Sequence, residues 1–195
     1  MPKKNPSSKR KVLSRESSLP IIFILMAIIA VIVWVNIQRT HEFTYTPTQL
    51  ETSVNSSTLQ IPDTNFTVTL KDGKAEYSDS DMQGNVSLSN PYFSIETSDG
   101  YDTFSTMNYT TGGSGEFIAI ALFHTIENST VFANTYTIGD RIKVENIEKI
   151  SGDKDVYEIK VDYLDREENA PMATDPTIKK SVTLKVDTHK IVTLP

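Results

Sequence analysis

The segment Tyr157–Tyr163 reads YEIKVDY, with apolar and charged side chains in strict alternation. Successive side chains of a β-strand point to opposite faces, so a period of two predicts a strand with one buried face. Phe66–Leu70 (FTVTL) and Val182–Val186 (VTLKV) alternate in the same way. Glu116–Ile126 (EFIAIALFHTI) is apolar at nearly every position, which favours a strand that is covered on both faces.

Short turn sequences separate these segments from one another and from further candidate strands at 131–138 and 142–150. The turns are Asp72-Gly73, Asp99-Gly100, Gly112–Gly115, Gly139-Asp140 and Gly152-Asp153. Strands of about 5–10 residues joined by short turns are typical of antiparallel sheets. We therefore predict a mainly β domain over residues 61–195, built as an antiparallel sandwich or a curled sheet, with α+β as the alternative class.

The N-terminal part of the chain contains one long apolar run, Leu19–Ile37 (LPIIFILMAIIAVIVWVNI). No charged residue occurs from position 17 to 38, and about twenty helical residues cross a hydrocarbon core of about 30 Å. We predict a transmembrane helix over 19–37. A cleaved signal peptide is the alternative, but the run exceeds the usual apolar region of about 7–15 residues and no small-x-small site follows it. The segment is therefore predicted to be an uncleaved signal anchor.

The charge distribution predicts the orientation of this helix. Residues 1–18 contain six Lys and Arg and one Glu, a net charge of +5, and the rest of the chain contains 13 Lys and Arg and 24 Asp and Glu, a net charge of −11. Because the positively charged flank of a membrane helix stays in the cytoplasm, the N-terminus is predicted to be cytoplasmic. The predicted order is a basic tail (1–18), the membrane helix (19–37), a Ser/Thr-rich stalk (38–60) and an extracytoplasmic domain (61–195) in the cell envelope.

Composition excludes several classes of function. The acidic C-terminal part lacks the basic surface that nucleic acid requires. The chain contains no cysteine, so it has no disulfide, no thiol nucleophile and no cysteine-ligated zinc. The three histidines, His41, His124 and His189, lack any metal-ligand spacing such as HExxH and are expected to be ordinary polar residues. With no catalytic motif, the chain is predicted not to be an enzyme.

Acidic residues cluster around one predicted turn, Ser98–Asp102 (SDGYD). Glu96, Asp99 and Asp102 are the candidate metal ligands, because carboxylate oxygens are what Ca²⁺ prefers. One turn supplies fewer oxygens than the six to eight that Ca²⁺ takes, so solvated acids remain the alternative interpretation. No other cofactor is expected.

Four segments follow one another in a fixed order over residues 61–195: TGGSG at 111–115, GDR at 139–141, YLDR at 163–166 and PMATDPT at 171–177. As an ordered set they resemble an uncharacterised group of bacterial extracytoplasmic proteins, which are lipoproteins or single-span membrane proteins. Members of that group carry a D-x-N-x-D-G loop that looks like a calcium-binding loop, and this chain keeps its last two residues, Asp99 and Gly100. The resemblance implies an envelope location and a β-rich domain, and it implies no activity.

The residues of these segments are predicted to have structural roles. Gly112, Gly113 and Gly115 form a hinge between two strands rather than a phosphate loop, because no lysine and no helix follow them. Two strand ends each place a carboxylate beside a guanidinium, which predicts ion pairs across neighbouring strands. The two adjacent couples are Asp140-Arg141 and Asp165-Arg166, which are expected to pair with each other across the strands, and the turn that contains Pro171 and Pro176 fixes the return of the chain.

The sequence therefore predicts a membrane-anchored accessory or interaction domain of the cell envelope, which holds a protein or envelope-polymer partner through a sheet face or edge. The alternative is an exported binding module for a small solute or Ca²⁺. A small-solute site would be a pocket lined by aromatic side chains from Tyr101, Phe104, Tyr109 and Phe117. A hydrolase with paired carboxylates is the third and weakest alternative.

Overall fold

The computed structural model describes residues 24–32, 45–168, 170–171 and 173–192. The chain forms two compact units, Met1–Thr44 and Tyr45–Pro195. In the first unit, residues 24–32 are helical and all of them are exposed. Within the described residues, no helix has the length and apolar character that crossing a membrane requires. The predicted basic tail (1–18) and both ends of the predicted membrane helix (19–37) lie outside the described residues.

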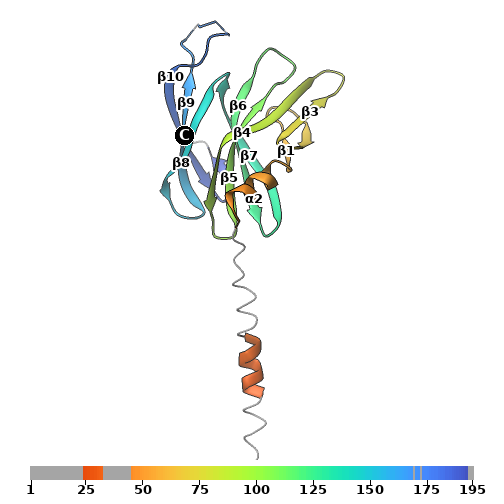
Figure 1. Cartoon of the computed structure of the whole chain (residues 1–195), viewed down its shortest axis with the longest axis vertical. Helices are drawn as coiled ribbons and strands as arrows, with labels where there is room; N and C mark the ends of the chain where they lie inside the picture. The colour runs from red at the N-terminus through yellow and green to blue at the C-terminus, as the bar shows by residue number, and fades with distance from the viewer. Residues whose placement is uncertain (1–23, 33–44, 169, 172, 193–195) are drawn as a thin grey trace, which may run out of the picture. The chain divides into compact units, whose positions relative to one another are not determined.

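The second unit is a mainly β domain, as the sequence predicts (Figure 1). Its sheets are a five-stranded sheet in the order β3-β4-β5-β6-β7, a four-stranded sheet in the order β11-β10-β9-β8, and the two-stranded pair β1-β2. All pairings between these strands are antiparallel. The elements are α2 (Pro47–Val54), β1 (Thr58–Gln60), β2 (Thr67–Thr69), β3 (Lys74–Ser78), β4 (Gln83–Glu96), β5 (Tyr101–Tyr109), β6 (Phe117–Ile126), β7 (Ser129–Asp140), β8 (Lys143–Gly152), β9 (Val156–Asp165), β10 (Ile178–Asp187) and β11 (Lys190–Val192).

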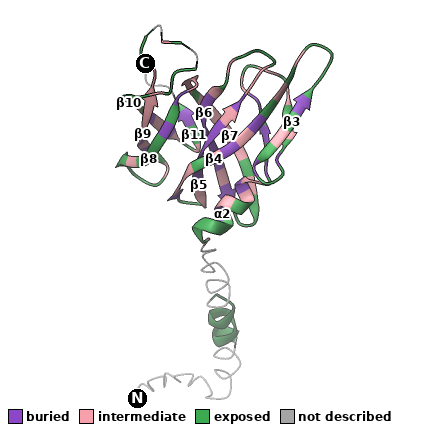
Figure 2. Cartoon of the chain, turned by 45° about the horizontal axis from the view of Figure 1, so that its top comes forward, coloured by how far each residue is buried: buried purple, intermediate pink, exposed green. Residues whose placement is uncertain are grey.

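The five-stranded sheet is covered on both faces. One face packs against the four-stranded sheet, in a cluster that joins Phe104 of β5 to Tyr157 and Ile159 of β9. The other face packs against α2, β1 and β2, in a cluster that includes Val54 and Leu59. Figure 2 shows the buried positions running along the central strands. The domain therefore has two hydrophobic cores, one on each face of a curled sheet.

Strand β6 shows why its sequence lacks alternation. Ile118, Ile120 and Leu122 belong to the cluster beneath the four-stranded sheet. Ala119 and Phe123, which point the other way, belong to the cluster beneath α2. Because both faces are buried, nearly every position is apolar, as predicted for 116–126. Strand β9 is buried on one face only, and its alternating pattern follows from that.

The domain begins earlier than predicted, and this corrects the stalk that was expected over 38–60. Thr46 caps α2 and forms a capping box with Gln49, and Pro47 occupies the first turn. Leu50 and Val54, four residues apart, face the core with 2% and 0% of their surface exposed. Two apolar side chains one turn apart are enough to dock so short a helix, so a segment that is otherwise Ser- and Thr-rich resembles a linker in sequence.

Candidate functional site

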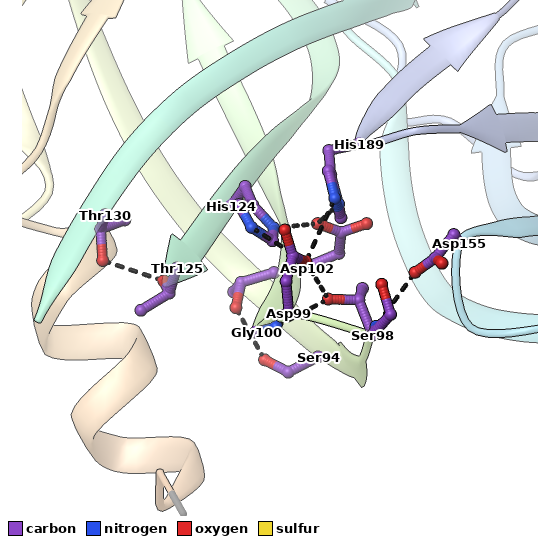
Figure 3. A network of polar contacts seen from close by, with 12 residues as sticks. Ser94, Ser98, Asp99, Gly100, Asp102, His124, Thr125, Thr130, Asp155 and His189 are labelled. Atoms are coloured by element: carbon purple, nitrogen blue, oxygen red, sulfur yellow. Dashed lines mark hydrogen bonds and ion pairs between the residues drawn. The ribbon is translucent and has the colours of Figure 1, made fainter. Parts of the chain in front are cut away.

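Four turns and strand ends meet at one end of the domain, and they bring together Asp99, Asp102, His124 and His189 (Figure 3). We call these four residues the histidine–aspartate cluster. Asp99 lies in the β4–β5 turn, Asp102 on β5 and His124 on β6, all in the five-stranded sheet. His189 lies in the β10–β11 turn of the four-stranded sheet. The cluster therefore joins the two sheets.

Asp102 is the centre of this cluster. It is fully buried, and the antiparallel register places it directly opposite His124. The Tyr157 hydroxyl donates to its Oδ2 atom at 2.6 Å. Burial, and after it the hydrogen bond with Asp102, raises the pKa of the Tyr157 hydroxyl far above its usual value. Tyr157 therefore stays protonated and remains a donor to the carboxylate.

Both imidazoles bond to the same oxygen of Asp102. His124 Nδ1 lies 2.8 Å and His189 Nδ1 lies 2.9 Å from Asp102 Oδ1. An ionised carboxylate only accepts hydrogen bonds, so the network assigns the hydrogen of each ring to Nδ1. The lone pair of each neutral imidazole is then on Nε2. The two rings stack with their centroids 3.7 Å apart and an angle of 33° between their planes.

The two Nε2 atoms face a second carboxylate. Asp99 Oδ1 lies 3.5 Å from His124 Nε2 and 3.3 Å from His189 Nε2. His124 Nε2 is buried and has no hydrogen-bond partner. Asp99, His124 and His189 each offer one candidate ligand atom, and the three atoms lie within 4.8 Å of one another. Because the rings stack, the two Nε2 atoms lie side by side at the Asp99 carboxylate, and a cation beside these electron-pair donors would be favourable.

A network of hydrogen bonds holds the turn that carries Asp99. The Thr97 hydroxyl donates to Asp99 Oδ1 at 3.2 Å and accepts from the Gly100 amide at 3.1 Å. The Ser98 amide donates to Asp155 in the β8–β9 turn, and this bond lowers the pKa of the Asp155 carboxyl. Position 100 requires glycine, because a Cβ there would lie 2.0 Å from the carbonyl oxygen of Thr125. The carboxylate is therefore held by its own turn and by both sheets.

The turn that carries His189 has an uncommon backbone. Thr188 and His189 form a two-residue connection between the paired residues Asp187 and Lys190, with φ angles of 48° and 60°. Such turns favour Asn-Gly, because a left-handed conformation costs other residues about 1–2 kcal/mol each. The Thr188 amide donates to the carbonyl of Asp155, which holds this turn against the β8–β9 turn. Strain of this kind is concentrated at functional sites.

The three predicted metal ligands, Asp99, Asp102 and Glu96, lie in three different surroundings. Asp99 faces the two imidazoles, whereas Asp102 lies behind them and orients them. Glu96 stands apart in an exposed ion pair with Lys154, at 2.5 Å. His124 and His189, which the sequence suggested were ordinary polar residues, contribute the two nitrogen atoms. Two imidazoles and one carboxylate suit a transition metal better than Ca²⁺, which takes oxygen ligands.

No short sequence spacing could have identified this cluster. His124 and His189 are separated by 65 positions, and each reaches Asp102 only through strand register. The one signal in the sequence was that these residues lie close to the ends of predicted strands. Asp99, His124 and His189 each lie at or next to a strand end, where several turns of a small sheet domain meet.

The predicted structural residues occupy the other end of the sheet. Asp140 Oδ2 lies 3.0 Å from Arg141 Nη1 and 3.7 Å from Arg166 Nη2. We call Asp140, Arg141 and Arg166 the arginine cluster. Arg166 also donates to the carbonyl of Pro171, at 3.5 Å. Asp165 pairs with Lys180 of β10 rather than with an arginine side chain.

The glycines of the predicted hinge lie in a loop between two strands, whereas two side chains of the predicted aromatic pocket are buried in the core. Gly112, Gly113 and Gly115 lie in the loop between β5 and β6, and Gly112 has a φ of 81°. Phe104 and Tyr109, expected to line a pocket for a small solute, are buried in the two core clusters. These two side chains therefore do not line an open pocket. Pro176, predicted to fix the return of the chain, lies in the loop between β9 and β10.

Comparison of the chain with family models, with curated proteins and with solved structures gave no match. We therefore infer the function from the geometry of the histidine–aspartate cluster.

Proposed function

We propose that this chain is a membrane-anchored extracytoplasmic domain that binds a divalent transition-metal ion through Asp99 Oδ1, His124 Nε2 and His189 Nε2. One observation carries the proposal: a single buried oxygen of Asp102 accepts a hydrogen bond from Nδ1 of both imidazoles. Metal-binding histidines typically donate their second ring N–H to a carboxylate in this way, which fixes the tautomer and the ring orientation.

The charges of the cluster support a divalent cation. Asp99 and Asp102 together carry −2, and the two imidazoles are neutral in the tautomer that the network assigns. Asp102 is fully buried, and a buried charge is costly unless an opposite charge compensates it. A divalent ion between the two Nε2 atoms and Asp99 makes the net charge of the cluster zero.

Protons on the Nε2 atoms are the alternative way to balance this charge, and the distances argue against them. A charge-assisted bond from an imidazolium to a carboxylate spans about 2.7–2.9 Å. The distances from Asp99 Oδ1 to the two Nε2 atoms are 3.3 and 3.5 Å. Four ligands at about 2.05 Å around a tetrahedral ion lie about 3.3–3.4 Å from one another. The two separations from Asp99 Oδ1 match this spacing, whereas the two rings, whose centroids lie 3.7 Å apart, have to move apart before both Nε2 atoms can bind one tetrahedral ion.

The membrane anchor is a separate part of this proposal, and the sequence supports it. The apolar run 19–37 is free of charge and has a basic flank before it and an acidic chain after it. The described residues 24–32 form a helix whose apolar side chains are exposed; Ile24, Met26 and Val31, for example, expose 60%, 64% and 59% of their surface. An extracytoplasmic location would place the metal site where the protein meets ions from outside. A protein or envelope-polymer partner stays a prediction.

Isothermal titration with Zn²⁺ tests the proposal on the full chain, purified in detergent micelles without a histidine tag. We expect one ion per chain. His124→Ala and His189→Ala should each weaken binding by at least about a hundredfold, the upper end of what loss of an orienting partner costs. Asp99→Asn tests the third ligand with the least risk to folding, because the Asp99 side chain is 47% exposed.

His41→Ala is the matched control, because it removes a histidine that is not one of the proposed ligands. It should leave the affinity and the stoichiometry unchanged. No heat of binding to the wild-type chain, or equal affinity in the variants of His124 and His189, would overturn the proposal.

A further inference from the structure

We propose that strand β7 is the surface through which this chain pairs with a second copy of itself, edge to edge and antiparallel, in a two-fold symmetric dimer. β7 lies at one edge of the five-stranded sheet, next to β6. In the described part of the chain, its backbone hydrogen bonds are those of the pairing with β6. The outer edge of such a strand offers a row of N–H and C=O groups to another strand.

The outer edge of β7 is accessible. None of its twelve residues is buried, whereas most of the ten residues of β6, which is paired on both sides, are buried. Two cavities of about 500 and 380 Å³ lie along β7, between it and the segment 56–63. β11 approaches from the other sheet, but the Asn134 side chain bonds both the N–H and the C=O of Ile191 there. The backbone of β7 therefore stays available for a further strand.

β7 differs in charge from the other edge strands of the two larger sheets. No charged residue occurs between Glu127 and Asp140. By contrast, β3 contains Lys74 and Glu76, and β8 contains two lysines and two glutamates. β11 is only three residues long and begins with a lysine. Charges and short lengths keep edge strands from pairing with other chains, and β7 has neither protection.

Charge and sequence favour a second copy as the partner. The chain after residue 18 has a net charge of −11, so two copies repel each other wherever their charged surfaces meet. β7 is a long edge at which two copies meet without bringing charges together. Seven of the nine residues of Thr130–Ile138 (TVFANTYTI) are β-branched or aromatic, and none is proline or glycine. Uncharged segments of this composition are the ones that pair with their own copies.

The β-bulges of β7 indicate where the two copies pair. The register with β6 shifts twice, which leaves Ala133 and Ile138 as extra residues of β7. Bulges interrupt pairing, so the regular stretch between them, 134–137, is the centre of the contact. A two-fold axis there places Thr135 close to the partner's Thr135, because residues related by the axis of an antiparallel pair lie opposite or diagonal to each other.

A charge swap at position 135 tests the dimer. Sedimentation equilibrium of the full chain in density-matched detergent micelles should give twice the chain mass of 21.8 kDa. Thr135→Lys and Thr135→Glu each bring like charges together at the axis and should raise the dissociation constant at least about a hundredfold. An equimolar mixture of the two variants should dimerise again, because lysine then meets glutamate. Asn146→Lys, on the charged edge strand β8, is the control and should dimerise as the wild-type chain does.

Crosslinking gives a second readout that does not depend on an introduced charge. The chain has no cysteine, so Thr135→Cys has a single thiol, and a short bismaleimide should link two such chains. Asn146→Cys should stay unlinked. A monomeric wild-type chain would overturn the proposal and leave the β7 edge to an extended peptide of another protein. Dimers that persist in both charged variants, or a mixture that stays monomeric, would overturn pairing at β7. None of these outcomes bears on the metal site.

Discussion

Two polar clusters lie at opposite ends of β6, and they combine different kinds of charged and polar side chains. At the end near Phe117, the arginine cluster sets two guanidinium groups against the carboxylate of Asp140. At the end near His124, the histidine–aspartate cluster sets two carboxylates against two imidazoles, which carry no permanent charge. The arginine cluster contains its own cations, whereas we propose that the histidine–aspartate cluster takes one from outside. A site that is incomplete without a ligand is the more informative of the two about function.

The largest expected effect is stabilisation by metal ions. Zn²⁺ at a thousand times its dissociation constant should raise the free energy of unfolding by about 4 kcal/mol, because it binds the folded chain alone. Thermal unfolding of the full chain measures this. Ca²⁺ at the same concentration is the control and should have little effect, because two of the three ligands are nitrogen atoms. Equal stabilisation by both ions would mean that the acidic turn, rather than the imidazole pair, binds the metal.

The second effect is the loss of metal affinity in Asp102→Asn. Loss of a carboxylate that orients the ligands costs about 10–100-fold in affinity, or about 1.4–2.7 kcal/mol. Asp140→Asn is the matched control at the other end of β6, and its affinity for Zn²⁺ should equal that of the wild-type chain. Titration calorimetry on both variants makes the comparison. Equal affinity in Asp102→Asn and the wild-type chain would show that Asp102 does not position the imidazoles.

The third effect concerns the arginine cluster alone. Arg166→Met removes one guanidinium but leaves Arg141 beside Asp140, so the carboxylate stays paired. We expect the free energy of unfolding to fall by about 1 kcal/mol, since both partners are partly exposed. Chemical denaturation measures this loss, and it should be the same with and without Zn²⁺. A loss that depended on Zn²⁺ would show that the two ends of β6 are coupled.

The smallest effect is on the pH dependence of stability. The hydrogen bond from Lys180 is the main cause that lowers the pKa of Asp165 below its usual value. A lowered pKa stabilises the folded state above the unfolded-state value of about 3.9, and this contribution is lost as the pH falls through the lower folded-state value. Asp165→Asn should therefore be slightly less stable than the wild-type chain at pH 7. The difference should vanish in acid, and a difference that persisted there would contradict the ion pair as its cause.

The two clusters also differ in how far the sequence could predict them. Asp140 and Arg141 are adjacent in the chain, and Arg166 directly follows a strand whose alternation is plain, so a structural ion pair could be anticipated. The imidazoles come from β6 and from a turn of another sheet, and their approach depends on registers that one sequence does not specify. The mainly β class could be predicted because periodicity is local. The prediction of a stalk was wrong over 45–60. These residues belong to the folded domain, but helix α2 docks through only two buried side chains, so its sequence gives little sign of a helix.

We infer that both imidazoles carry their hydrogen on Nδ1 and offer Nε2 to a metal ion. Long-range ¹H–¹⁵N NMR of the histidine rings in the metal-free full chain tests it most directly. We predict the Nδ1–H tautomer for both His124 and His189, and a large change in both Nε2 resonances when one equivalent of Zn²⁺ is added. An Nε2–H tautomer in either ring would contradict the assigned hydrogen-bond network, and Nε2 resonances that do not respond to Zn²⁺ would contradict the metal site.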